Sequence, residues 1–488
     1  MNKVSSFKSF LFLIPFLLFF ASSAFAITPS PVSKNDSVKQ FVIRKVVLIG
    51  NKRTKNQILY RELFFHVGDT LEESNLEKIL QKSKENLLNT LLLNIADIQR
   101  VEDGPAVSNG TDTILQGLDI YIFVAERWYI FPAPIFELAD RNFNEWWKTK
   151  DFSRTNYGGY LYWNNFRGRN ETVVLALRLG YTQQIGISYN IPYINRHQKD
   201  GLAISYSYNH NHEVGYHTDL NYLDYLNVPD LYVKREWQGG IQYSHRQAIY
   251  DTYYFSVDEH YASISDTVLK LNSDFFAKEM TSEKYVRFRF LFKHDERDNI
   301  NYPLTGNYFD FEAVKNGLPV LSDDINFGFV TSQVKKYWKL WNKFYFASGA
   351  KGKFSSADPQ PYYNTRALGY DGDYLRGYEY YVVNGQKFIL LKTDFKYELL
   401  PVHYLHAGII PSEKFSTIPY CFYLNLYADY GYVQDKQYYM YNPLTNSNLY
   451  SFGGGIDFAS YYNFVLRVEY SINKFGQTGI FIHFTAPI

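Results

Sequence analysis

The chain has 488 residues, and its 50 lysine and arginine residues against 49 aspartate and glutamate residues give a formal net charge of +1. This balance, without a run of like charges, argues against nucleic acid as the main partner, because phosphate binding requires a clustered basic excess. Aromatic residues make up 19% of the chain although its mean hydropathy is −0.31, which excludes a polytopic helical membrane protein and is typical of a transmembrane β-barrel.

The first 26 residues have the order of a secretory signal peptide: a basic start, an apolar run over 10–20 and small residues at 24–26. We predict cleavage before Ile27; the alternative is an uncleaved anchor, for which the apolar run is short. Residues 27–40 are polar and contain prolines, so we predict a linker there.

Residues 41–126 are predicted to form a small α/β domain with the order β-α-α-β-β. Thr70 and Glu73 match a capping box, which predicts that the second helix begins there. Apolar residues at helical spacing predict the buried face of that helix: Leu76, Ile79, Leu80, Leu87 and Leu88. The other elements are expected at 41–49 (strand), 54–65 (helix), 95–101 (strand) and 118–124 (strand).

From about residue 127 the chain alternates between apolar and polar residues, as where Phe288 and Phe290 interleave with Arg287 and Arg289. Such rows fit lipid outside and a wet lumen inside, so 127–488 is predicted to be an all-β transmembrane barrel of about 16 antiparallel strands. The candidate strands lie near 128–138, 156–165, 171–180, 182–193, 201–210, 235–246, 249–262, 284–295, 306–316, 323–339, 342–354, 387–399, 420–433, 449–458, 462–472 and 477–484.

Two connections, 211–234 and 355–386, are long and are expected on the same side of the barrel, outside the cell if the α/β domain lies in the periplasm. The connection 400–419 falls on the opposite side, where turns are usually short.

Five ordered motifs carry a family resemblance. They are Arg154–Gly159, Asn165–Arg169, the set Asp295, Arg297, Asp298, Pro303 and Gly306, the run Leu375-Arg376-Gly377-Tyr378, and Tyr427–Gly431. Together they resemble the BamA/TamA-type outer-membrane assembly proteins, which have periplasmic POTRA domains and a sixteen-stranded barrel. The run 375–378 resembles the signature of that family's sixth extracellular loop. The resemblance implies that 41–126 is a POTRA-like periplasmic domain and that the barrel lies in the outer membrane.

Arg376 is predicted to pair with Asp429 inside the barrel. Strand parity places Asp429 on the lumen face, and a guanidinium in a confined lumen needs an acceptor. Asp394 and Glu398 are rival acceptors, and an exposed loop arginine is the alternative. Gly377 would let the loop turn tightly.

The seam between the first and last strands is predicted to be weak. Pro132 and Pro134 lack a backbone N–H, and the last strand is short, with Pro487 beyond it. We expect Phe136 to lie near Phe481 across the seam; a simple structural boundary is the alternative reading of the prolines. The chain does not end in the usual aromatic residue, so Phe481 or Phe484 is the candidate recognition residue.

Other chemistry is weakly supported, and we predict no enzyme, cofactor or metal. The sequence has no Gly-x-Ser-x-Gly motif, its single Cys421 excludes a disulfide, and 453–455 lacks the lysine of a phosphate loop. These glycines are expected where a neighbour packs closely. His210, His212 and Glu213 suggest a metal site, but a solvated loop is favoured.

We therefore expect an outer-membrane assembly, insertion or translocation factor. Its partners would be outer-membrane lipid, unfolded or nascent polypeptide received by the POTRA-like domain, and periplasmic accessory proteins, with no nucleic acid. Room for one POTRA-like domain puts a general, essential insertase in doubt and leaves an auxiliary role open. The alternatives are a two-partner-secretion-like transporter, or a channel or structural barrel whose POTRA-like domain binds a periplasmic partner.

Overall fold

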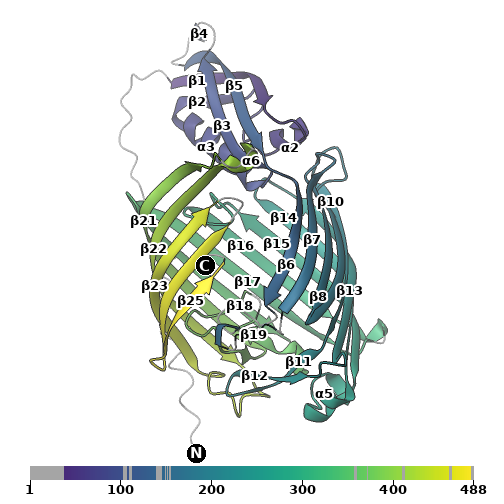
Figure 1. Ribbon diagram of the computed structural model, residues 1–488. Helices are drawn as coiled ribbons and strands as arrows, with labels where there is room; N and C mark the ends of the chain where they lie inside the picture. Colours follow the sequence, from purple (N-terminus) through teal and green to yellow (C-terminus); the bar gives the residue numbers. More distant parts are fainter. Residues whose placement is uncertain are drawn as a thin grey trace, which may run out of the picture.

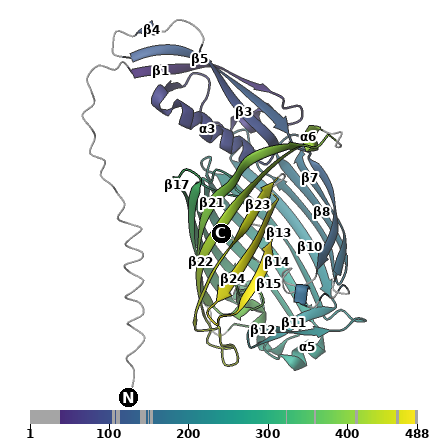
Figure 2. The same ribbon diagram turned by 60° about the vertical axis from the view of Figure 1, so that its left-hand side comes forward.

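A barrel of 16 strands carries a small α/β domain on one rim in this computed structural model (Figures 1 and 2). The structure describes residues 38–484 except 103–106, 109–112, 139–145, 149, 151, 153–154, 322, 357–359, 371, 409–412 and 461–463. The expected signal peptide, most of the linker and Pro487 lie outside the described residues. In the described part of the chain, no helix has the length and apolar character needed to cross a membrane.

The α/β domain has a mixed sheet with two helices. Its strands are β1 (Val38–Ile49), β2 (Thr70–Glu72), β3 (Leu93–Glu102), β4 (Val107–Ser108) and β5 (Thr113–Glu126), and its helices are α2 (Asn56–Tyr60) and α3 (Glu73–Asn89). The sheet order is β2-β1-β5-β3, with β1 parallel to β5 and β3 antiparallel to it, so the domain is POTRA-like. The expected face of α3 is confirmed, because Leu76 and Leu87 are buried in the same core as Phe41.

Two expectations about this domain are wrong in detail. The first strand begins at Val38, inside the expected linker, because β1 pairs with β5 from that residue onward. Thr70 does not cap the second helix: it lies in β2, opposite Val42 of β1, and α3 begins without a side-chain cap. The short strands β2 and β4 were therefore missing from the expected order.

The barrel confirms the expected fold class. Its strands, all antiparallel, are β6 (Ile130–Leu138), β7 (Thr155–Phe166), β8 (Glu171–Gly180), β9 (Thr182–Ile191), β10 (Asp200–Asn211), β13 (Lys234–Arg246), β14 (Asp251–Ile264), β15 (Ser282–Asp295), β16 (Gly306–Asn316), β17 (Phe327–Trp341), β18 (Phe344–Ser355), β21 (Lys387–His406), β22 (Thr417–Gln434), β23 (Asn448–Ser460), β24 (Val465–Asn473) and β25 (Thr478–His483). In β22, Tyr427 and Asp429 are buried toward the lumen while Leu424 and Leu426 are exposed on the outer face.

The expected turn at 400–419 is wrong. β21 continues to His406 and β22 begins at Thr417, and the two strands stay paired through register shifts around Leu400. A short helix, α6 (Glu413–Ser416), follows at the end of this ribbon, beside the α/β domain (Figure 2). The segment is a strand extension because bulges absorb the irregular residues that interrupted the alternation.

The two long connections lie at the end of the barrel opposite the α/β domain, as predicted (Figure 1). The first contains the hairpin β11 (Glu213–Asp219) and β12 (Tyr222–Asn227), and the second contains β19 (Arg366–Leu368) and β20 (Val383–Asn384); α5 (Asp266–Leu271) follows β14. Asn221, fully buried at the hairpin tip, exchanges hydrogen bonds with the backbone of Val382. The two connections therefore support each other across the mouth of the barrel.

Candidate functional site: the inward loop and the seam

The run Leu375–Tyr378 lies inside the barrel, against the wall made by its last strands. Leu375 packs in an apolar cluster with Leu390 and Val433, and the Tyr378 hydroxyl donates to Tyr450 O at 3.1 Å. Gly377 has a φ of +81°, and a Cβ added there would lie 3.4 Å from Ser451 Cβ. Glycine is therefore needed both for the turn and for the close approach of the loop to the wall.

Arg376 is fully buried and contacts two of its three candidate acceptors, Asp429 and Asp394. Its Nε donates to Asp429 Oδ2 at 2.7 Å, Nη2 donates to the other oxygen of Asp429, and Nη1 donates to Asp394 Oδ1. The guanidinium carbon lies 3.8 Å from the centre of the Tyr427 ring. Glu398, the third candidate, instead accepts a hydrogen bond from Tyr345. The loop is thus held by charge and by stacking on one wall.

Asp394 links Arg376 to a second arginine that the sequence analysis missed. Arg467 Nη2 donates to Asp394 Oδ2 at 3.2 Å, and Arg467 Nε donates to Asp457 Oδ1 at 2.6 Å. The Tyr302 hydroxyl donates to the other oxygen of Asp457 at 2.7 Å. Buried charges are tolerated when they are paired and hydrogen-bonded, as all four are here. The sequence does contain a signal for Arg467, because the alternation of inward and outward residues along β24 places it on the lumen face.

The glycines of β23 make room for the ring that supports Arg376. A Cβ added to Gly453 would lie 2.5 Å from the Tyr427 ring and 2.3 Å from Tyr470 O. The Tyr427 hydroxyl also donates to Ser471 Oγ. The expectation that these glycines allow a close neighbour is met at Gly453.

The mid-barrel motif forms the turn between β15 and β16. Arg297 donates through Nε and Nη2 to the two oxygens of Asp295, both at 2.7 Å, and Asp298 accepts from the backbone N–H groups of 304 and 305. Pro303 is buried in this turn. Gly306 has a φ of +107°, and a Cβ there would lie 2.2 Å from Glu296 O, so another residue would clash.

This turn also contacts the α/β domain. Asn89, the last residue of α3, donates to Arg297 O at 2.9 Å and accepts from Ile300 N at 3.2 Å. The side-chain amide nitrogen of Asn89 makes the first of these bonds, and its amide oxygen makes the second. The motif therefore docks the domain as well as shaping the turn.

The Asn165–Arg169 motif, at the turn between β7 and β8, makes a similar contact with the α/β domain. Asn165 Nδ2 donates to Thr54 Oγ1 at 2.9 Å, and Lys55 N donates to Gly168 O at 3.0 Å. The sequence analysis missed this docking role, because it depends on which rim turns face the domain.

Glu62, buried in the α/β domain, anchors a third turn. Arg246, at the end of β13, donates to its two oxygens at 2.7 and 2.6 Å. Burial opposes ionisation of Glu62, but the charges and hydrogen bonds of Arg246 and Arg61 outweigh it and lower the pKa of Glu62. The ion pair is therefore retained well into the acidic range.

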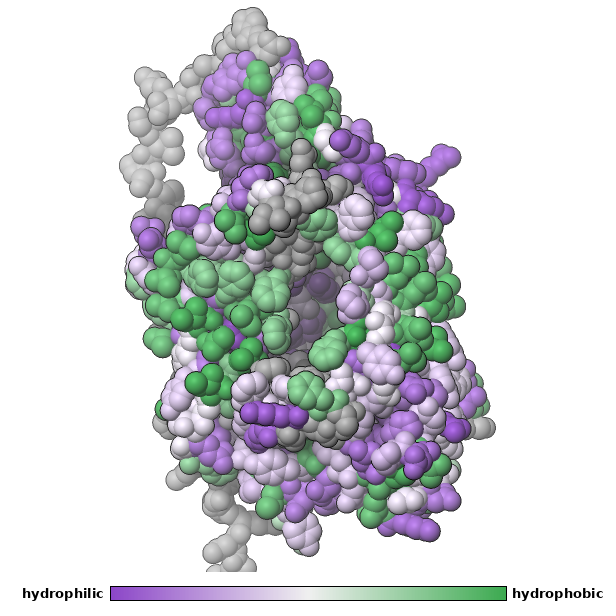
Figure 3. Space-filling model, in the orientation of Figure 1, coloured by the Kyte–Doolittle hydropathy of each residue, from purple (hydrophilic) through white to green (hydrophobic). Residues whose placement is uncertain are grey.

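The seam lies between the two end strands of the barrel ladder. β6 and β25 are not neighbours among the described strands, and Figure 3 shows the surface hollowed between these edges, with hydrophilic residues visible inside. Asn164 N donates to Tyr129 O at 2.7 Å. Since backbone groups alternate in direction along an antiparallel strand, Pro132 and Pro134 present their nitrogens to the seam.

The expected proximity of Phe136 and Phe481 is wrong. Phe136 is 71% exposed on the outer face, whereas Phe481 is 3% exposed and lies inside, 5.5 Å from the ring centre of Tyr380. Side chains on opposite faces of a sheet do not form a cross-strand pair. Ile480 and Phe484 are the exposed apolar residues at this edge.

The alternative metal site at His210, His212 and Glu213 is not formed. The rings of both histidines pack against Tyr232, with centres 4.2 and 4.3 Å away. In the described part of the chain, the one grouping of possible metal ligands lies elsewhere. Cys421 is buried and forms no disulfide, because it is the single cysteine of the chain.

The fold and the loop-filled lumen define a membrane β-barrel protein with a POTRA-like domain. The Omp85 superfamily domain matches residues 165–481, more than half of the chain, and the chain belongs to that superfamily. Its class is therefore that of outer-membrane barrels for polypeptide insertion or translocation, which are not enzymes.

Solved structures give similar but distant folds. The chain is similar to BamA from Haemophilus ducreyi lacking POTRA domains 1–3, with 14% identity over 91% of this chain and 83% of that one and a TM-score of 0.48. CdiB from Escherichia coli has 10% identity, coverage of 99% and 98%, and a TM-score of 0.47. CdiB from Acinetobacter baumannii has 13% identity, coverage of 91% and 74%, and a TM-score of 0.43. No curated protein matches the chain.

Proposed function

We propose that the protein inserts outer-membrane proteins, or translocates exported ones, by opening the seam between β6 and β25. The observation that carries this proposal is that, among the described strands, these two form the ends of the ladder and are not paired with each other. Within lipid, an unpaired strand edge leaves backbone groups unsatisfied, so a client strand that pairs there is stabilised.

The chemistry of the β6 edge supports a weak seam. Pro132 and Pro134 offer carbonyl oxygens but no N–H groups to a strand across the seam. β25 is short, at six residues, and limits the length of any ladder. Closure by these two strands therefore forms few hydrogen bonds, which keeps the cost of opening low.

We place the α/β domain in the periplasm, where it would receive the client. β3 is an edge strand of its sheet, with Ile95 and Val101 exposed. An extended polypeptide adds to such an edge through main-chain hydrogen bonds and needs little sequence specificity. The docked rim turns would then hold the bound client close to the barrel.

A seam staple tests the proposal. Outward-facing Phe136→Cys and Ile480→Cys, in a Cys421→Ser background, are joined by bis-maleimides of increasing length, and client insertion into proteoliposomes is measured by protease protection. We expect the shortest linker that reacts to abolish insertion.

The matched control staples two strands that are already paired. Leu177→Cys and Ile185→Cys are directly opposite each other on β8 and β9 and face outward. This control should retain activity. Equal activity of the seam staple and the control would rule out lateral opening.

Insertion and translocation are separated by pinning the loop. Gly377→Cys with Ser451→Cys places two Cβ atoms about as far apart as a disulfide requires. We expect the oxidised protein to stop translocating through the lumen while it still inserts through the seam. Gly377→Cys alone controls for the strain of the substitution.

A further inference from the structure

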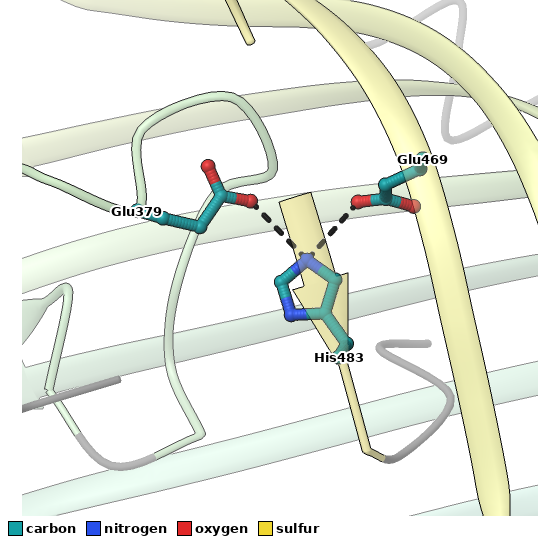
Figure 4. Close-up of side chains that lie close together, drawn as sticks. All are labelled: Glu379, Glu469 and His483. Carbon is teal, nitrogen blue, oxygen red and sulfur yellow. Dashed lines mark ion pairs between the residues drawn. The ribbon is translucent and has the colours of Figure 1, made fainter. Parts of the chain in front are cut away.

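Three metal-ligating side chains converge beside the inward loop. Glu379 follows the Leu375–Tyr378 run, Glu469 comes from β24 and His483 ends β25 (Figure 4). The Nε2 atom of His483 lies 3.4 Å from Glu379 Oε1 and 3.3 Å from Glu469 Oε1. All three ligand atoms lie within 4.8 Å of one another.

At the centre of this cluster, Glu469 and His483 are joined by a long ion pair and not by a hydrogen bond. Glu469 is 1% exposed, and neither of its carboxylate oxygens has a hydrogen-bond partner in the described part of the chain; the same holds for His483 Nε2. Arg467 Nη1 approaches Glu469 no closer than 4.0 Å. Both ion pairs of Glu469, to His483 and to Arg467, are long, and a buried carboxylate without a close donor is costly, so the position between these atoms favours a cation.

The neighbours that contact His483 and Glu379 also suit metal binding. The Tyr374 hydroxyl contacts His483 Nδ1 at 3.1 Å and its ring stacks on the imidazole, which fixes the ring and leaves Nε2 as the ligand atom. Gly377 N donates to Glu379 Oε1 at 3.1 Å and orients that carboxylate. Both arrangements are typical of groups that hold a metal ligand in place.

The two distances from His483 Nε2 fit a shared metal ion better than a close ion pair. Two atoms each about 2.0–2.1 Å from a tetrahedral zinc ion lie roughly 3.3–3.4 Å apart, which matches the two distances from His483 Nε2 to the glutamates. A charge-assisted hydrogen bond between imidazolium and carboxylate would be shorter, about 2.7–2.9 Å. One imidazole with two carboxylates is a nitrogen–oxygen set that suits zinc better than magnesium or calcium.

We propose that Glu379, Glu469 and His483 bind one divalent transition-metal ion, with zinc as the matching ion. The ion would join the loop to β24 and to β25. Because β25 has a neighbouring strand on one side in the described ladder, the ion would strengthen the attachment of the seam edge to the loop that Phe481 and Tyr380 already provide. The site stands independently of the proposed insertion activity.

Zinc titration of the mature protein tests the site. The protein, folded in detergent micelles and freed of metal with EDTA, is titrated with ZnCl₂ or MgCl₂ by calorimetry. We expect one zinc ion per chain and no comparable binding of magnesium. Glu469→Gln and His483→Gln should each weaken zinc binding roughly tenfold or more, as should Glu379→Gln in the loop.

Controls separate this site from surface binding. His212→Gln removes a histidine next to another histidine, and it should leave the zinc affinity unchanged. Heat-modifiable migration on a gel verifies that each variant is folded, and zinc should slow hydrogen exchange at 478–483 in the unaltered protein. Zinc binding no tighter than magnesium binding, or equal zinc affinity in the ligand variants, would overturn the proposal and indicate an ion pair or an adventitious ion only.

Discussion

The two walls of the barrel are packed differently. In β21, Lys392 and Asp394 face the lumen and are buried beneath the inward loop, and Lys396 is buried against the Tyr302 ring of the β15–β16 turn. In β8, the inward residues Ala176 and Arg178 are only partly buried. One wall therefore behaves as a protein core and the other as a wet surface.

The seam joins these unlike walls. On one side β25 is linked to the loop through Phe481 and Tyr380. On the other side β6 is preceded by Tyr129, whose hydroxyl donates to Leu92 O of the α/β domain. The last strand is thus coupled to the loop and the first strand to the docked domain, so movement of either element reaches one edge of the seam.

Removing the charge that holds the loop should produce the largest effect on the packed wall. Arg376→Ala leaves Asp429 and Asp394 buried without their main donor, at a cost on the order of 2–5 kcal/mol, less if water enters. We expect lower stability toward urea and faster proteolysis within 355–386. Arg376→Lys should restore part of the charge but not the two-pronged contact.

A double-mutant cycle sharpens this prediction. Arg376→Ala and Asp429→Ala should be non-additive by more than about 0.5 kcal/mol. Asp429→Ala alone should cost less than Arg376→Ala, since Asp394 still accepts from the arginine. Additive effects would show that the two side chains do not interact.

The docking of the α/β domain onto the barrel should respond to pH through the ion pair between Glu62 and Arg246. The folded-state pKa of Glu62 lies below its ordinary value of about 4.3, so its contribution is complete above that value and is lost as pH falls through the lowered pKa. We expect energy transfer between dyes on Glu77→Cys and Lys343→Cys, in a Cys421→Ser background, to show undocking at strongly acidic pH.

Glu62→Gln should loosen docking at neutral pH, at a cost of about 1.5–3 kcal/mol for the lost charged hydrogen bonds. Asp97→Asn, which changes a partly exposed acid that is bonded within the same domain to Lys84 and Gln99, is the control and should preserve the docking response. A Glu62→Gln protein that docks and titrates like the unaltered one would contradict the assignment.

A smaller loss of stability is expected when a side chain is added at Gly453, beside the Tyr427 ring. Gly453→Ala would place a methyl group 2.5 Å from that ring, and overpacking of this kind costs about 1–3 kcal/mol. Gly352→Ala is the matched control in β18, where the nearest atom would be 3.6 Å away. Urea unfolding of both variants should separate them, with the control close to the unaltered protein.

The strands and part of the site could be predicted from local sequence patterns. The face on which a residue lies follows from the alternation along its own strand, without knowledge of the strands that pair with it. The lumen position of Asp429 followed from β22 alone. The sharing of Asp394 by Arg376 and Arg467 did not, since it depends on the path of a loop across three strands. Likewise, Glu379, Glu469 and His483 are far apart in sequence and carry no common motif. The ribbon around Leu400 was missed because bulges break the period on which strand prediction depends.

The unequal lengths of the strands affect the surrounding bilayer. β21 has 20 residues, whereas β25 has six. At about 3.3 Å per residue and a tilt of about 40°, β25 rises roughly 15 Å, less than the roughly 25 Å apolar band of such barrels. The excess length of β21 extends beyond the bilayer, but β25 is too short to match the band, so we expect the lipid beside β25 to thin or the barrel to tilt. Either response leaves lipid packing least ordered next to the edge where the barrel wall is interrupted.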